Sequence, residues 1–220
     1  MKKYVLLAVP IFLYGQGVLF YFQSNSSLFG QSLVNLVTII ILLSLLLKQT
    51  HFHHVLDWIV GTAFVLYFCV LYHQTVEFEW YFSNIHYSPE DISYVFNFVN
   101  LMPLTGILEV LRYNPNATFQ ILGNLMMLAP LAFAMLYFKW TTSYKRVVLY
   151  AFLCSVGIEV FQFFQTIIST VFSLGIGRST DIDDIILNTL GAGIGIGVYH
   201  LWTMIVKVYR QKREKSHLTA

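Results

Sequence analysis

The sequence predicts an all-α membrane protein, a polytopic bundle of about six transmembrane helices with both termini in the cytoplasm. The first observation is composition, because 57% of the 220 residues are hydrophobic and only 11% are charged, whereas a soluble domain carries about 25% charged residues. The second is a series of long apolar segments, and the third is the uneven distribution of lysine and arginine between them. The formal net charge of +2 is too small to indicate a nucleic-acid partner.

The first apolar segment runs from Tyr4 to Phe22, directly after the basic pair Lys2 and Lys3. It is longer than the apolar region of a signal peptide, about 7–15 residues, and no small-residue cleavage site follows, so we expect it to be a retained first span. Five further apolar segments are expected to cross the membrane, which takes ~20 residues per helix. They cover 33–47, 55–72, 118–138, 147–169 and 184–206, the first two being short for a span.

The longest connection, 73–117, is acidic and ends in a moderately apolar stretch that is interrupted by proline. We expect an interfacial or re-entrant segment there, because non-helical backbone at membrane depth must be sheltered by protein or water. Lysine and arginine concentrate before the first span, at Lys48, at 139–146 and after residue 206, all on one side of a six-span protein. By the positive-inside rule that side is cytoplasmic, and the stretch 177–197, "GRSTDIDDIILNTLGAGIGIG", begins at the outer face.

Acidic residues in two of the expected spans lie toward this outer face. In the fifth span Glu159 and Gln162 are three residues apart and share a helix face. In the sixth, Asp181, Asp184 and Asn188 follow an i, i+3, i+7 spacing and also share one face. An acidic residue at the centre of a membrane helix costs about 2.5–3.5 kcal/mol on insertion, so Glu159 is expected to face the bundle interior and to have a partner there.

Three more polar residues are expected at the same depth, which are Asn124 in the fourth span, Asn100 in the outer connection and Arg178 before the sixth span. Arg178 is the expected partner of the carboxylates, either in a structural ion pair or as a group that grips an anionic ligand. Paired carboxylates also suit acid–base catalysis. The catalytic candidates are therefore Glu159, Asp181 and Asp184. The same oxygen ligands suit Mg²⁺ or Ca²⁺, which leaves a divalent cation open as a cofactor.

The sixth span also has two patterns with structural interpretations. Thr180 and Asp183 fit a capping box at its start, so part of the acidity is explained by helix capping. Gly191 and Gly195 are four residues apart, the small-xxx-small spacing that allows two membrane helices to approach closely. We expect these glycines to pack against another helix.

These residues together resemble the VanZ-like family of bacterial membrane proteins. The pattern is Arg178-x-x-Asp181-x-x-Asp184-x-x-x-Asn188-x-x-Gly191-x-x-x-Gly195, preceded by Glu159-x-x-Gln162, by Gly123-Asn124 with Pro130 six residues later, and by "NLMPL" at 100–104. The resemblance covers residues 95–200 and defines a VanZ-like domain at 93–206. Residues 1–92 are then transmembrane helices outside it, and 207–220 form a basic cytoplasmic tail.

The resemblance implies a multi-pass protein of the bacterial cytoplasmic membrane, and the founding member of the family is associated with resistance to the glycopeptide teicoplanin. It implies no established activity, so whether the protein is an enzyme stays open. We expect a cell-envelope protein whose acidic outer site binds or acts on a lipid-linked cell-wall precursor or a glycopeptide. The alternative is a non-enzymatic accessory protein in which the polar cluster only locks the helices together. A transporter is less favoured, because only Glu159 lies well inside a span.

Overall fold

The computed structural model describes residues 2–78, 92–172 and 178–218, and this part of the chain is almost entirely helical. Six of its helices are long and apolar enough to cross a membrane. They are Lys2–Gln23, Leu28–Lys48, Val55–Thr75, Ala117–Tyr137, Tyr144–Val171 and Ile182–Tyr209. The predicted all-α architecture with six spans is therefore confirmed, whereas the orientation of the termini in the membrane remains a prediction.

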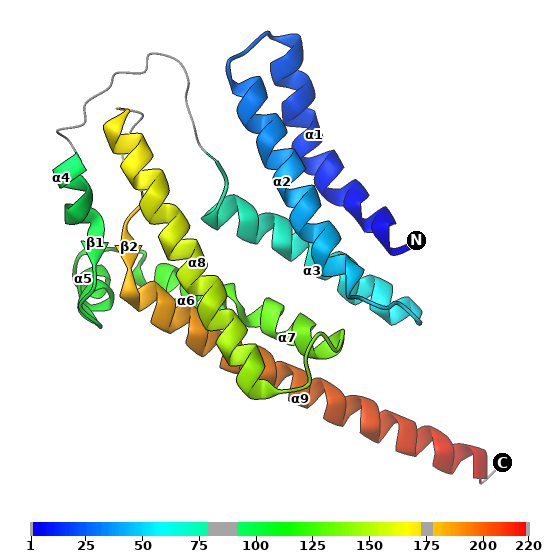
Figure 1. The fold of residues 1–220 in the computed structure, drawn as a ribbon. Coiled ribbons are helices and arrows are strands. Elements are labelled where there is room, and N and C mark those ends of the chain that lie inside the picture. The colour runs from blue at the N-terminus through cyan, green and yellow to red at the C-terminus, as the bar shows by residue number, and fades with distance from the viewer. Residues whose placement is uncertain (1, 79–91, 173–177, 219–220) are drawn as a thin grey trace.

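The N-terminal part of the molecule is a helical hairpin followed by a third span. The first span starts as the 3₁₀ helix η1 (Lys2–Leu7) and continues as α1 (Ala8–Gln23). It lies beside α2 (Leu28–Lys48), which runs in the opposite direction (Figure 1). The third span, α3 (Val55–Thr75), contacts both helices of the hairpin and also the C-terminal part of the bundle, which it reaches through α7.

Short elements follow the third span, and none of those described is long enough to cross a membrane. They are α4 (Ile92–Val95), the 3₁₀ turn η3 (Phe96–Phe98), β1 (Val99–Asn100) and α5 (Thr105–Tyr113). Leu104, Leu108 and Leu111 of this region are 57% to 62% exposed on one side of α5 or just before it, as expected for an interfacial helix. Residues 79–91 of the predicted interfacial connection lie outside the described residues.

The fourth span is divided into α6 (Ala117–Met127) and α7 (Ala129–Tyr137), which meet at Leu128. Pro130 lies in the first turn of α7. Because proline has no N–H group, it cannot donate to the carbonyl four residues earlier, and the regular helix is interrupted there. Proline is tolerated in a first helical turn, where an N–H group has no partner within the helix, so the second half of the span begins again directly after the interruption.

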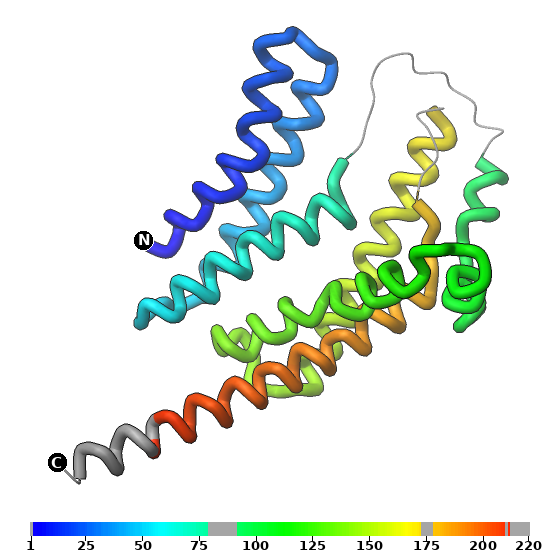
Figure 2. Tube along the Cα trace, turned by 180° about the vertical axis from the view of Figure 1, so that it is seen from behind, coloured from blue at the N-terminus to red at the C-terminus, as the bar shows by residue number. Residues whose placement is uncertain are grey.

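The centre of the C-terminal part is α9 (Ile182–Leu218), which is preceded by β2 (Thr180–Asp181). It packs along α6 and α7 and also against α8 (Tyr144–Val171). Figure 2 shows from behind that α6 and α7 follow α9 over much of its length. This arrangement places the start of α9 and the second half of α8 at the same end of the bundle as α5 (Figure 1).

Two glycines of α9 allow its close approach to the fourth span. A Cβ atom added at Gly191 would collide with the backbone carbonyl oxygen of Leu125, and one at Gly195 would collide with that of Ala129. A Cβ atom at Gly193 would meet nothing within 4 Å. The small-residue spacing of 191 and 195 therefore corresponds to the face of α9 that contacts another backbone.

Candidate functional site

The candidate site begins at a short parallel pairing of β1 with β2, in which Val99 lies opposite Thr180 and Asn100 opposite Asp181. The Asn100 side-chain amide donates a hydrogen bond of 3.0 Å to the carboxylate of Asp181. Gly106 of α5 makes room for this contact, since a Cβ atom there would collide with the Asp181 carboxylate and would lie 3.1 Å from Nδ2 of Asn100. The outer connection is thereby joined to the start of α9.

Asp181 links three parts of the site through its side chain and its backbone. Its carboxylate accepts the backbone N–H of Asp183 at 2.8 Å, and its own N–H donates to Oε2 of Glu159 at 2.9 Å. Asp181 therefore caps α9, whereas the buried hydroxyl of Thr180 has no hydrogen-bond partner among the described residues. The predicted capping box of Thr180 and Asp183 is wrong, because the acceptor for the first turn is the residue directly before the helix.

Asp183 caps a different helix from the one that contains it. Its carboxylate accepts the N–H of Leu104 at 2.6 Å and the N–H of Ile107 at 3.0 Å, both at the start of α5. The side chain is only 2% exposed, so these bonds replace water that the carboxylate would otherwise bind. Sequence reasoning assigned Asp183 to capping, but spacing along one helix gives no indication of a second helix 76 residues earlier in the chain.

Asn124 of α6 donates its side-chain N–H to the carboxylate of Asp184, which closes the site on the side of the fourth span. Glu159 of α8 is buried, with 3% of its surface exposed, and the charges of Asp181 and Asp184 both act on it. We call the five side chains that meet here the acid cluster. Its members are Asn100, Asn124, Glu159, Asp181 and Asp184.

Gln162 and Arg178 were expected in the same group, but they contact the end of α3. The Gln162 amide donates to the carbonyl of Thr75 at 3.1 Å, and a guanidinium nitrogen of Arg178 donates to the carbonyl of Gln74. No ion pair between Arg178 and a carboxylate is present in the part of the chain that the structure describes. Both side chains act on carbonyl groups that have no partner within their own helix, as at every helix C-terminus.

Two further side chains, which the sequence analysis did not single out, also form hydrogen bonds to the backbone after α3. The Gln165 amide donates to the carbonyl of Glu77 at 2.7 Å. Asn35 of α2 donates to the carbonyl of Phe78 at 3.0 Å and accepts its N–H at 2.9 Å. Side chains from α2, α8 and the segment before α9 therefore hold one end of α3.

Asn188 lies one helical turn below the acid cluster. It follows Asp184 by four residues in α9 and donates to the hydroxyl of Ser155 at 3.0 Å, and Ser155 precedes Glu159 by four residues in α8. The side-chain oxygen of Asn188 is buried and has no hydrogen-bond partner within the described ranges. This residue belongs to the interface of α8 with α9 and is not hydrogen-bonded to the carboxylates.

The pocket at the acid cluster is small. Its lining includes Asn124, Asp181, Asp183 and Asp184, and it encloses about 20 Å³, whereas one water needs about 10–15 Å³ measured in the same way. The site as it stands therefore admits one small polar group. Within the described ranges no group of three or more His, Cys, Asp or Glu side chains is arranged to hold a metal ion, so the divalent-cation alternative gains no support from the geometry.

Comparison with curated proteins and with solved structures found no match. The family model described as VanZ/LLP1 matches residues 58–203. This segment includes every member of the acid cluster. It also includes α3 from Trp58 onward, which the sequence motifs alone leave outside the resemblance, while α1 and α2 stay outside it. Because the match covers more than half of the 220 residues, the protein belongs to the VanZ/LLP1 family.

Proposed function

We propose that this protein binds a polar group of a cell-wall or lipid-linked ligand at the acid cluster, on the outer face of the bacterial cytoplasmic membrane. The observation that carries the proposal is the unbalanced charge of the site. Glu159, Asp181 and Asp184 meet there with amide partners, and no lysine or arginine pairs with them in the described part of the chain. Carboxylates in such a place favour a proton or a cationic partner.

The size and charge of the site restrict the ligand chemistry. A phosphate would be repelled by the carboxylates, whereas an amine would be attracted and a hydroxyl would find acceptors for its hydrogen bonds. The pocket of about 20 Å³ accommodates one such group and not a whole ligand. Sugars and stem peptides of cell-wall precursors carry both groups, as do glycopeptides, which makes an effect on teicoplanin susceptibility part of this proposal.

A second candidate function is a structural one, and it rests on the same hydrogen bonds. Asp183, Asn124 and Asp181 connect α5, α6, α8 and α9 at one end of the bundle. In that case the cluster locks the helices and the protein acts as an accessory partner without its own ligand. The two functions differ in what the charge of Asp184 does, because a lock needs only its hydrogen bond to Asn124.

The experiment is therefore the replacement of Asp184 with asparagine, which keeps the size and a carbonyl acceptor for Asn124 and removes the charge. If the acid cluster binds a ligand group, the Asp184→Asn variant should have normal abundance and a Tm within about 2 °C of the wild type. Cells that carry this variant should nevertheless show the altered cell-wall precursor profile and teicoplanin susceptibility of a deletion strain. Glu109→Gln is the matched control, since it removes an equal charge from an exposed site on α5. Loss of abundance together with the phenotype favours the lock, and a normal phenotype refutes the binding role of Asp184.

A further inference from the structure

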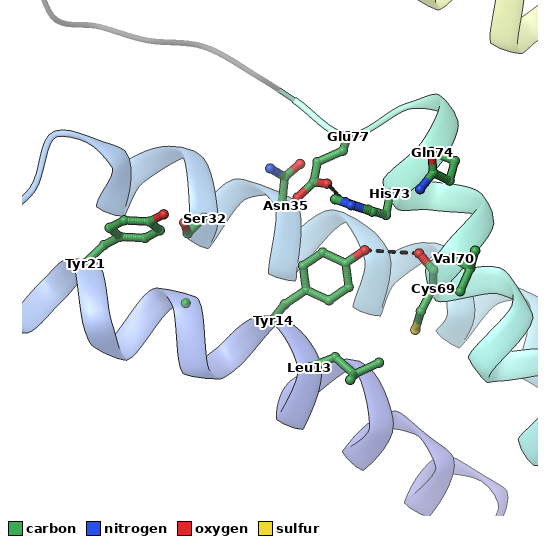
Figure 3. Close-up of a pocket in the computed structure, with 11 residues that line it drawn as sticks. Leu13, Tyr14, Tyr21, Ser32, Asn35, Cys69, Val70, His73, Gln74 and Glu77 are labelled. Carbon is green, nitrogen blue, oxygen red and sulfur yellow. Dashed lines mark hydrogen bonds and ion pairs between the residues drawn. The ribbon is translucent and has the colours of Figure 1, made fainter. Parts of the chain in front are cut away.

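A second and larger cavity lies between α1, α2 and α3, away from the acid cluster (Figure 3). Its volume is about 460 Å³, within the range of about 300–1,000 Å³ that small-molecule sites occupy. Two of the three helices that form it lie outside the segment matched by the family model. The cavity is therefore a feature of this chain that the acid cluster and its proposed ligand do not explain.

The end of the cavity near the ends of the helices is polar. Tyr21 and Ser32 lie close together on the side of the α1–α2 hairpin, and His73 and Glu77 form an ion pair at the end of α3 (Figure 3). Tyr14 lies between them, and its hydroxyl donates to the backbone carbonyl of Cys69 at 3.1 Å. Phenolic rings and ionisable groups at this level suit the interface between water and hydrocarbon.

Apolar side chains beside these polar groups also line the cavity and face outward. Leu13 and Val70 are 49% and 61% exposed, and both belong to helices that span the membrane, so they contact hydrocarbon. Leu13 precedes Tyr21 by eight residues in a continuous helix, which corresponds to about 12 Å along its axis. Polar and apolar side chains thus line the cavity together over a length that matches the head and upper chains of a membrane lipid.

The charges at the polar end indicate the kind of head group. No lysine or arginine is among the described residues that line the cavity, and the acceptors there include the carboxylate of Glu77 and the hydroxyls of Tyr14, Tyr21 and Ser32. A carboxylate has acceptor positions beyond the one that His73 occupies, and tyrosine rings attract cations through their faces. An ammonium group fits this set of acceptors.

We propose that this cavity is a binding site for an aminophospholipid, with the ammonium group at Glu77 and the acyl chains along Leu13 and Val70. The segment that carries Glu77 is held in place without a ligand. The carbonyl of Glu77 accepts a hydrogen bond from Gln165, and the side-chain amide of Asn35 makes two hydrogen bonds to the backbone of the next residue. A site that is ordered beforehand loses less conformational entropy on binding.

Gly17 offers a direct test, because it lines the cavity and a Cβ atom there would meet nothing within 4 Å. A leucine at this position fills the cavity from one side without disturbing the fold, and leucine is a better helix former than glycine. Gly15→Leu is the matched control on the same helix, since Gly15 does not line the cavity and its Cβ atom would make only an ordinary contact of 4.0 Å with Ile11.

The measurement is native mass spectrometry of the full-length protein in detergent, titrated with dioleoyl phosphatidylethanolamine or dioleoyl phosphatidylglycerol. We expect one phosphatidylethanolamine per chain, bound about tenfold more tightly than phosphatidylglycerol. Gly17→Leu is expected to weaken this binding about tenfold and Gly15→Leu to leave it unchanged. Glu77→Gln keeps the hydrogen bond to His73 and is expected to abolish the preference between the two lipids.

Equal retention of the two lipids by the wild-type protein would overturn the proposal, and so would undiminished binding by Gly17→Leu. Dodecylamine serves as a third probe, since it carries an ammonium group without a phosphate or a second chain. Binding of dodecylamine that depends on Gly17, without binding of phosphatidylethanolamine, would contradict a phospholipid site. None of these results depends on the acid cluster, so a failure here leaves its proposed function untouched.

Discussion

Asp183 belongs to α9, yet its carboxylate completes the first turn of α5. It accepts the N–H of Leu104, whose backbone has a φ of 70°, and the N–H of Ile107. A left-handed conformation costs a residue with a side chain about 1–2 kcal/mol. The hydrogen bonds that the two N–H groups donate to this buried carboxylate offset the strain, so one side chain fixes both the position of α5 and the unusual turn before it.

Replacing Asp183 with alanine is expected to destabilise the protein more than any exposed substitution near it. Both N–H groups lose a charged acceptor, which lowers the free energy of unfolding by about 2–3 kcal/mol. The Tm of a chain of this size falls by about 2–4 °C for each kcal/mol. Thermal unfolding of the purified protein in detergent measures the change. Glu109→Ala, on the exposed side of α5, is the control and should keep the wild-type Tm. An unchanged Tm for Asp183→Ala would show that α5 is held by other contacts.

Arg178 is expected to tolerate lysine, because its observed partner is a neutral carbonyl, that of Gln74, and one nitrogen suffices to donate to it. Arg178→Ala should lower the free energy of unfolding by about 1 kcal/mol, whereas Arg178→Lys should stay close to the wild type. A charge exchange, Arg178→Asp combined with Asp181→Arg, should not restore stability. Recovery of both Tm and phenotype in the exchange would instead demonstrate a carboxylate partner for Arg178.

Hydropathy predicted each of the six spans, but it began the second helix too late and ended the third too early. The second span begins at Leu28 and the third ends at Thr75, each extending past the apolar run through polar residues such as Ser32 and His73. These polar side chains line the cavity between α1, α2 and α3. A helix that lines a cavity keeps its backbone hydrogen bonds while its side chains become polar, so average hydropathy underestimates its length.

The candidate site was predictable to the extent that one helix determines it. The spacing of Asp181 and Asp184 gives a common face, and both lie in the observed acid cluster. Spacing cannot show which neighbour that face meets, so the contact of Gln162 with α3 was missed. Gly106 was missed as well, although a glycine at the start of a helix is a signal for close approach of another group.

The glycines of α9 give a prediction with an internal control. Gly191→Leu and Gly195→Leu should each lower abundance and Tm, because any side chain there would push α9 away from the backbone of α6 and α7. Gly193→Leu should have little effect, since space is open at that position of the same helix. Equal losses for all three variants would show that helix propensity or hydrophobicity, and not close packing, explains the effect.

The orientation of the whole molecule in the membrane is tested by cysteine labelling of intact cells. Cys69 and Cys154 are first replaced with alanine, and single cysteines are then introduced at Ser179 or Thr142, which are exposed at opposite ends of the bundle. The distribution of lysine and arginine predicts that Ser179→Cys reacts with an impermeant maleimide and that Thr142→Cys reacts only after permeabilisation. The reverse pattern would place the acid cluster in the cytoplasm and refute an outer ligand.

The hydrogen bonds that later side chains donate to the carbonyl groups at the end of α3 have a consequence for biosynthesis. The carbonyl of Thr75 receives its hydrogen bond from Gln162, and the carbonyl of Gln74 receives its hydrogen bond from Arg178, which lies 104 positions later. Neither bond can form until its donor has been translated. At about 5–20 residues per second, Arg178 is translated roughly 5–20 s after Gln74. The third span therefore leaves the ribosome early, but the hydrogen bonds at its C-terminal end are among the last to form. A nascent chain that stops before residue 178 carries an incompletely capped helix, however well its early spans have inserted.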